Sequence, residues 1–219
     1  MEIHDIANER HLTKLFIRAV KTCNLYSVKN IFSGDTISRK KYGDIFTKYF
    51  GQYAPIIVAK PDVVLIVEDH KKLIDEWLII AIELKYFKQV DRKRWREAYR
   101  EIGQALRYYV YGFDSAILCH IFMKEIDDCV VKAYSDVIGE VIEKLKLPIV
   151  YFSMKTSNVE NLNKFLVFKP VEISNPSDIC YIVKWLINCC RDGVRNPLLP
   201  HDKEIIDRRK ILKTIFQVP

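Results

Sequence analysis

Apolar residues recur at helical spacing near the start of the chain. Within residues 8–25 they lie three or four positions apart, and Asn8 is a residue type that often caps helix N-termini. The pattern predicts an amphipathic helix there, and similar patterns predict helices over 91–111, 131–146 and 177–190, followed by a basic C-terminal helix. The apolar stripe of the first helix consists of Leu12, Leu15, Phe16, Ala19 and Val20.

Two segments, residues 55–68 and 77–86, are rich in Val and Ile and are apolar at odd and even positions alike. Strands of this kind are buried on both faces, so we expect them near the centre of a sheet covered by helices. The polar segment 69–76 between them is expected to connect a hairpin. Further core strands are predicted over 115–122 and 149–153.

The order of these elements predicts an α/β fold with a central mixed β-sheet flanked by helices. We expect the core to occupy residues 1–154, and residues 155–219 to form a C-terminal elaboration of helix and strand packed on that core. Residues 26–53 have mixed periodicity, so a strand and a short helix are both compatible with that stretch.

The composition narrows the class of protein. The chain has 219 residues, 49% hydrophobic, with a formal charge of +7 and a pI near 9.0. This is a globular composition, and its basic balance favours a polyanionic partner such as nucleic acid or an anionic membrane surface. The N-terminus lacks an apolar signal, and the longest apolar runs are too short to cross a bilayer. We therefore expect a soluble, cytoplasmic protein without a membrane partner.

The six cysteines are scattered along the chain and include no Cys-x-x-Cys pair. A zinc ribbon is therefore not expected, and buried free thiols are the default. Two alternatives remain open: a disulfide, if the source is a hyperthermophile, and an iron–sulfur cluster held by four of the six.

The hairpin carries the candidate chemistry. If its turn lies around Lys72 and Leu73, Asp62 lies opposite Glu83 on one face of the sheet, and Lys85 shares that face. One reading of this group is a partly buried salt bridge. However, two acids facing one lysine leave a surplus negative charge, which is costly in a low-dielectric place unless a cation binds. Carboxylate oxygens suit Mg²⁺.

Lys60-Pro61-Asp62, followed after twenty residues by Glu83-Leu84-Lys85, resembles the PD-(D/E)XK nuclease superfamily. The resemblance extends over residues 6–153 and implies a restriction-endonuclease-like core. It also implies that Asp62, Glu83 and the Leu84 main-chain carbonyl hold Mg²⁺ or Mn²⁺, while Lys85 positions the attacking water and offsets charge on the scissile phosphate.

Two helices add candidate residues. Glu9 lies on or beside the apolar stripe of the first helix, where it either has a function or favours the helix dipole. Residues 7–12 resemble the first helix of archaeal Holliday-junction resolvases, which implies that Glu9 completes the acidic cluster. Gln104 and Tyr108 resemble a Gln-x-x-x-Tyr motif of RecB-type nucleases, which implies that Gln104 braces the site or touches substrate. Otherwise they are a surface Gln beside a half-buried Tyr.

The segment from Lys85 to Arg107 holds eight basic and three acidic residues. Such a run is usually a solvated face, but this one begins at the candidate catalytic lysine, so we interpret it as a track for backbone phosphates. The residues expected to bind nucleic acid are Lys88, Lys93, Arg96, Arg100, Arg107 and Tyr108.

Taken together, these features predict a metal-dependent nuclease that hydrolyses DNA phosphodiester bonds. Its size and element order resemble archaeal junction resolvases and the related nucleases of archaeal spindle-shaped viruses, which implies a structure-directed endonuclease. A RecB-like exonuclease, a non-catalytic nucleic-acid-binding protein and a structural protein are the alternatives. No P-loop is present, so no nucleotide cofactor is expected. A homodimer is expected because the helix over 177–190 has an apolar face without an obvious partner.

Overall fold

The computed structural model describes residues 8–37, 43, 47, 60–72, 76–158, 164–170 and 178–218. Six strands form one sheet in the order β1-β2-β3-β4-β5-β6. The β1/β2, β2/β3 and β5/β6 pairs are antiparallel, whereas β3/β4 and β4/β5 are parallel. The strands are β1 (Val28–Ser33), β2 (Val63–Glu68), β3 (Trp77–Phe87), β4 (Ser115–Met123), β5 (Ile149–Asn158) and β6 (Lys164–Lys169). The predicted α/β class with a mixed sheet is therefore confirmed.

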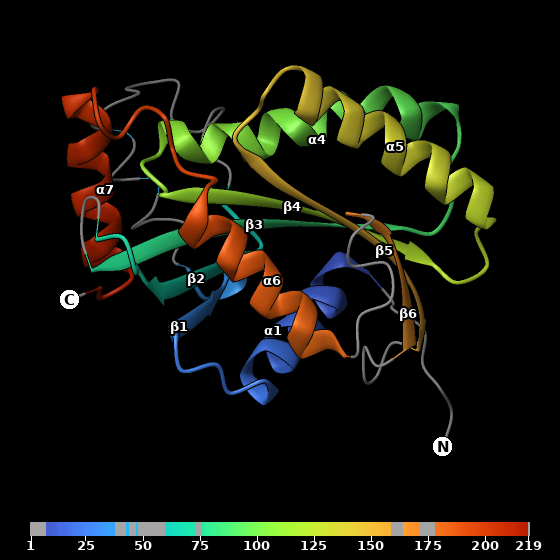
Figure 1. Ribbon diagram of the computed structural model, residues 1–219, viewed down its shortest axis with the longest axis horizontal. Helices are drawn as coiled ribbons and strands as arrows, with labels where there is room; N and C mark the ends of the chain where they lie inside the picture. Colours follow the sequence, from blue (N-terminus) through green and yellow to red (C-terminus); the bar gives the residue numbers. More distant parts are fainter. Residues whose placement is uncertain are drawn as a thin grey trace.

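Helices cover both faces of this sheet (Figure 1). One face packs against α1 (Glu9–Thr22) and α6 (Ile179–Asp192), and the other packs against α4 (Arg92–Val110) and α5 (Asp128–Lys144). A last helix, α7 (Lys203–Ile215), contributes Leu212 to the apolar layer under α4 and α5. Phe216, the residue after α7, is buried in the same layer. The short 3₁₀ helix η1 (Gly34–Thr36) follows β1.

The central strands are buried on both faces, as their continuous apolar sequence predicted. Along β3, Leu78, Ile80 and Ile82 belong to the layer under α1 and α6. Ile79 and Ala81 belong to the layer under α4 and α5. The side chains alternate because successive residues of a strand point to opposite faces.

Helix starts follow local sequence signals. The predicted cap of α1 is confirmed, because the Asn8 side chain accepts a hydrogen bond from the His11 backbone N–H at 3.0 Å. Asp127 caps α5 in the same manner, so this helix begins at Asp128, a few residues before the predicted start. In the ambiguous region 26–53, the described residues contain β1 and η1.

The last third of the chain is integrated into the sheet. The division at residue 154 falls inside β5, and β6 extends the sheet beyond it. Side chains of α6 join one apolar layer, and Leu212 and Phe216 join the other. The described residues after 154 therefore contribute to the same two apolar layers as the residues before them.

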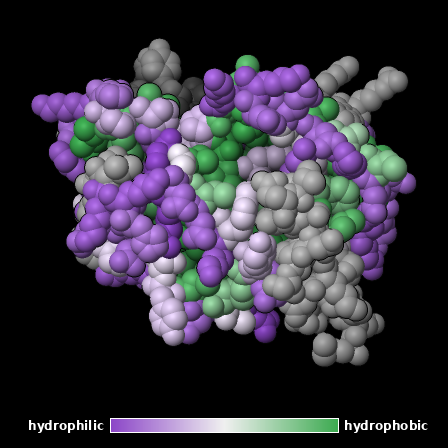
Figure 2. All heavy atoms as spheres, in the orientation of Figure 1, coloured by the Kyte–Doolittle hydropathy of each residue, from purple (hydrophilic) through white to green (hydrophobic). Residues whose placement is uncertain are grey.

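The apolar face of α6 has its partner within the chain. Ile182, Val183 and Leu186 are buried in the layer that α1 shares. Hydrophilic residues cover much of the surface on the side where α6 lies (Figure 2). The argument for a homodimer from an unpartnered α6 was therefore wrong, and the dimer itself stays a prediction.

A disulfide joins the two helices on this face. Cys23, the C-cap of α1, is bonded to Cys180 in the first turn of α6 across 157 positions of sequence. The expectation of free thiols was therefore wrong for this pair, because a contact between distant helices leaves no mark in local spacing. The other four cysteines, Cys119, Cys129, Cys189 and Cys190, are not in disulfides.

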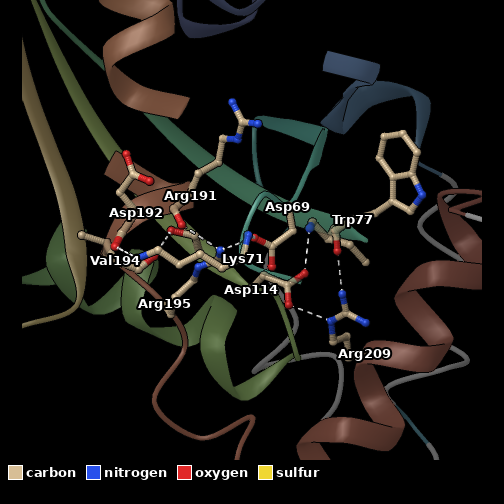
Figure 3. Close-up of polar contacts among 11 residues, drawn as sticks. Asp69, Lys71, Trp77, Asp114, Arg191, Asp192, Val194, Arg195 and Arg209 are labelled. Atoms are coloured by element: carbon tan, nitrogen blue, oxygen red, sulfur yellow. Dashed lines mark hydrogen bonds and ion pairs between the residues drawn. The ribbon is translucent and has the colours of Figure 1, made fainter. Parts of the chain in front are cut away.

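Buried ion pairs hold the C-terminal segments to one end of the sheet (Figure 3). Asp114, before β4, accepts a hydrogen bond from Arg209 Nε at 2.7 Å and one from the Ile79 N–H at 2.7 Å. Arg209 also donates to the Trp77 carbonyl. Asp69, after β2, lies 2.6 Å from a guanidinium nitrogen of Arg195. We call Asp69, Asp114, Arg195 and Arg209 the arginine cluster.

Candidate active site

The β2–β3 hairpin brings the predicted acids together. The predicted register is confirmed: Val63 pairs with Ile82 and Glu68 with Trp77. Asp62 and Glu83 therefore occupy the next opposed positions, at the end of the sheet remote from the arginine cluster. Val63, Ile82 and Leu84, the residues next to them along the strands, lie in the layer under α1 and α6. Since successive side chains of a strand point to opposite faces, Asp62, Glu83 and Lys85 all lie on the face that α4 covers.

Two side chains contact Glu83, and Asp62 lies just before the neighbouring strand. The ammonium of Lys85 lies 2.6 Å from Glu83 Oε1, and the Tyr108 hydroxyl donates to Glu83 Oε2. Asp62 Oδ2 accepts a hydrogen bond from the Leu84 backbone N–H at 2.8 Å. Glu83 is 3% exposed, while Asp62 and Lys85 are partly exposed. We call Asp62, Glu83, Lys85 and Tyr108 the carboxylate cluster.

The charges of this cluster do not balance. Burial raises the pKa of Asp62 to about 7, and repulsion from Glu83 adds to the rise. The Leu84 N–H and Lys85 oppose it without cancelling it. Burial alone would lower the pKa of Lys85, but its ion pair with Glu83 and the charges of Glu9 and Asp62 together outweigh burial and raise it. Lys85 is thus held in its charged form, while Asp62 carries a carboxyl that a nearby cation would ionise.

Glu9 reaches the same region from α1. It is exposed in the first turn of that helix and lines a surface cavity of about 290 Å³ together with Asp62. Its charge raises the pKa values of both Asp62 and Lys85. The structure thus brings Glu9 near Asp62, at an exposed position rather than on the buried stripe. The cavity is lined by Glu9, Arg10, Thr13, Ser33, Gly34, Asp35, Lys60, Pro61 and Asp62.

The backbone before β2 is fixed by close contacts. The Gly34 N–H donates to the Asp62 carbonyl at 2.8 Å, and a Cβ on Gly34 would lie 2.4 Å from the Pro61 carbonyl oxygen. The Lys60 ammonium donates to the carbonyls of Gly34 and Ile37. Only glycine permits this approach, so Gly34 positions Asp62. Sequence analysis missed Gly34 and assigned no role to Lys60.

The residues predicted on α4 and just before it divide into four groups. Tyr108 is completely buried and bonded to Glu83, so it belongs to the carboxylate cluster and cannot contact nucleic acid. Gln104, one turn before it, is partly exposed. Lys88, after β3, and Arg100 are exposed, and Arg107 is partly buried. The side chains of Lys93 and Arg96 lie outside the described part of the structure.

A second polar group lies behind the cluster. His120, on β4 beside Lys85, is completely buried, and its Nε2 lies 3.0 Å from Glu101. Its Nδ1 lies 3.1 Å from the Tyr151 hydroxyl. Burial lowers the pKa of His120 below its usual value, so we expect a neutral ring. The prediction that His120 is a core residue is confirmed.

The carboxylates of Asp62 and Glu83 are of the type that binds a divalent cation, but two of them are fewer than a complete set of protein ligands. Within the described ranges, no group of three or more His, Cys, Asp or Glu is arranged to hold a metal. Asp62 and Glu83 nevertheless supply two carboxylates, and among the described residues Asp62 Oδ1 has no hydrogen-bond partner. The surplus negative charge is what an oxygen-coordinated ion such as Mg²⁺ would neutralise. Asp62, Glu83 and the Leu84 carbonyl remain the residues that would hold it, with Glu9 beside them.

Comparisons with protein-family models, with curated proteins and with solved structures found no match for this chain. Among the described helices, none is both long and apolar enough to span a bilayer.

Proposed function

We propose that this chain is a metal-dependent nuclease with a restriction-endonuclease-like core, acting on DNA as a structure-directed endonuclease. The observation that carries the proposal is the convergence of Asp62, Glu83 and Lys85 at one end of the sheet, where Asp62, a carboxyl with a pKa raised to about 7, lines a surface cavity. A bound Mg²⁺ or Mn²⁺ would lower the pKa of a coordinated water and stabilise the charge that develops on the phosphate.

The protein groups have distinct tasks in this proposal. Asp62 and Glu83 hold the cation, and the Tyr108 hydroxyl fixes the orientation of Glu83. Lys85 is held in its charged form by Glu83, so it can orient the attacking water and offset charge on the phosphate. The exposed Lys88 and Arg100 extend from the same region and would contact backbone phosphates.

The second candidate is a nucleic-acid-binding protein without catalysis. One observation favours it: both carboxylate oxygens of Glu83 are already engaged, one by Lys85 and one by Tyr108. A salt bridge of this kind can be purely structural. The two candidates differ only in whether the cluster binds a cation and cleaves.

The deciding experiment incubates the pure protein with labelled linear, flapped, four-way and closed circular DNA in Mg²⁺, Mn²⁺ or chelator. We expect cleavage that needs the metal and that includes circular DNA, which an exonuclease would spare. Glu83→Gln should slow cleavage by roughly 10³-fold or more without loss of the folded state.

The matched control is Glu76→Gln, which removes an exposed acid at the other end of the same hairpin and should leave the rate unchanged. Cleavage retained by Glu83→Gln would overturn the proposal. Tight binding to DNA with no cleavage in either metal would favour the non-catalytic candidate. The homodimer is tested separately by sedimentation at micromolar concentration.

A further inference from the structure

The outer side of α4 contains a glycine that packing does not require. Gly103 is exposed near the middle of this 19-residue helix, and apart from its chain neighbours and the nearby backbone of α4 itself, no heavy atom of the described chain lies within 4 Å of the place a Cβ would occupy. Alanine would fit there and would favour the helix, because glycine is a poor helix former. A residue that breaks a local rule without a structural gain points to a function at that position.

The neighbours of Gly103 on the helix surface are suited to nucleic acid. Tyr99, one turn before it, is 62% exposed, an unusual position for a large aromatic ring. Arg100, the next residue, is also exposed. An aromatic ring beside a guanidinium is the combination with which proteins bind single strands, the ring stacking on a base and the cation contacting phosphate.

This surface lies on the outer side of α4, and a basic flank of the helix separates it from the carboxylate cluster. Successive residues of a helix turn by about 100°, so Arg100 and Arg107 both lie roughly 90° around α4 from Tyr108. Gly103 lies roughly 140° and Tyr99 roughly 180° from Tyr108, so the Tyr99 ring points away from the sheet. Since Tyr108 reaches Glu83 beneath the helix, Arg100 and Arg107 lie on the flank between the carboxylate cluster and this outer surface.

We propose that Tyr99, Arg100 and Gly103 form a binding surface for a nucleic-acid strand with unpaired bases. The Tyr99 ring stacks on a base, Arg100 contacts a phosphate, and the missing side chain of Gly103 lets the strand approach the helix. A paired base has both faces covered by its neighbours, so the exposed ring favours an unpaired strand over a duplex. The proposal rests on the proposed function, because it names the form of nucleic acid that the proposed nuclease would bind.

The test measures binding by fluorescence anisotropy in EDTA, where no cleavage occurs, with a labelled single-stranded oligonucleotide and a duplex of the same sequence. Tyr99→Ala should weaken single-strand binding about tenfold and leave duplex binding nearly unchanged. The control is Tyr181→Ala, which removes a 48% exposed tyrosine from α6 on the opposite face of the sheet and should change neither affinity.

Gly103→Ala provides a test in which two readouts move in opposite directions. It should raise Tm by about 2 °C through helix propensity and weaken single-strand binding several-fold. Gly139→Ala, in the middle of α5, is the matched control, since its Cβ would meet the flexible Lys169 side chain at an ordinary 3.4 Å. It should raise Tm without a change in affinity.

The inference is overturned if Tyr99→Ala leaves single-strand affinity unchanged, if it weakens both substrates equally, or if the wild-type chain prefers the duplex. A Gly103→Ala protein that is more stable and binds normally also overturns it. Because binding is measured without metal, a chain that binds single strands as expected but never cleaves refutes the nuclease and leaves this surface standing.

Discussion

Acidic side chains lie at both ends of the same sheet, but the two ends differ in how many positively charged side chains pair with them. In the arginine cluster, Asp69 pairs with Arg195 and Asp114 with Arg209, so each carboxylate has its own guanidinium. In the carboxylate cluster, Asp62 and Glu83 face Lys85, with Glu9 nearby, so acids outnumber the cations among the described side chains. The paired charges of the arginine cluster hold the C-terminal segments against the sheet. The excess of acids in the carboxylate cluster is instead the arrangement that a bound cation would neutralise.

The largest expected effect is on stability, and it separates the two ends. Asp114→Asn leaves the buried Arg209 without its counter-charge and should lower the free energy of unfolding by about 3–5 kcal/mol. Asp62→Asn removes a surplus charge and should raise the free energy of unfolding at pH 8 by about 2 kcal/mol or more. Denaturant unfolding measures both variants, and equal destabilisation by the two would contradict the comparison.

The second expected effect is a pH dependence that belongs to Asp62. Its pKa is 3.8 in the unfolded chain and about 7 in the folded protein. As pH rises from about 4 to 7, the unfolded state loses this proton first, so the Asp62 contribution makes stability fall through that window and level off above it. The measured quantity is the free energy of unfolding of the wild type minus that of Asp62→Asn. Between pH 5 and 8 we expect this difference to fall by about 2–3 kcal/mol.

Adding Mg²⁺ gives a second comparison between the wild type and Asp62→Asn. A cation that binds the ionised cluster stabilises only the folded state, so Mg²⁺ at pH 8 should raise the Tm of the wild type and raise that of Asp62→Asn much less. A pH profile identical in the two proteins would show that Asp62 ionises normally and that the negative charge at this end is not in surplus.

The two ends also differ in how far sequence could predict them. Asp62, Glu83 and Lys85 lie on or beside neighbouring strands that are only eight residues apart in sequence, so alternation and register alone placed them together. The pairs Arg209–Asp114 and Arg195–Asp69 join residues 95 and 126 positions apart, and such contacts depend on how the last helices pack. The disulfide, the contact of Gly34 with Pro61 and the packing of α6 against the sheet also join segments distant in sequence, so local patterns could not predict them.

The smallest of these effects concerns the link between the helices that flank both ends. α1 carries Glu9 beside the carboxylate cluster, while α6 leads into Arg195 of the arginine cluster, and Cys23–Cys180 joins the two helices. A cross-link over so long a loop stabilises mainly by restricting the unfolded chain, so Cys23→Ser should lower the free energy of unfolding by about 2 kcal/mol. A reductant should lower that of the wild type equally.

Cys129→Ser is the matched control, because Cys129 is an exposed free thiol on α5 and should tolerate the change. The bond acts on the fold as a whole, so Cys23→Ser should bind DNA with wild-type affinity at temperatures where it remains folded. An unchanged unfolding free energy would show that the helices hold their places without the bond. A loss of DNA affinity in the folded variant would instead show that the bond keeps α1, and with it Glu9, in position beside Asp62.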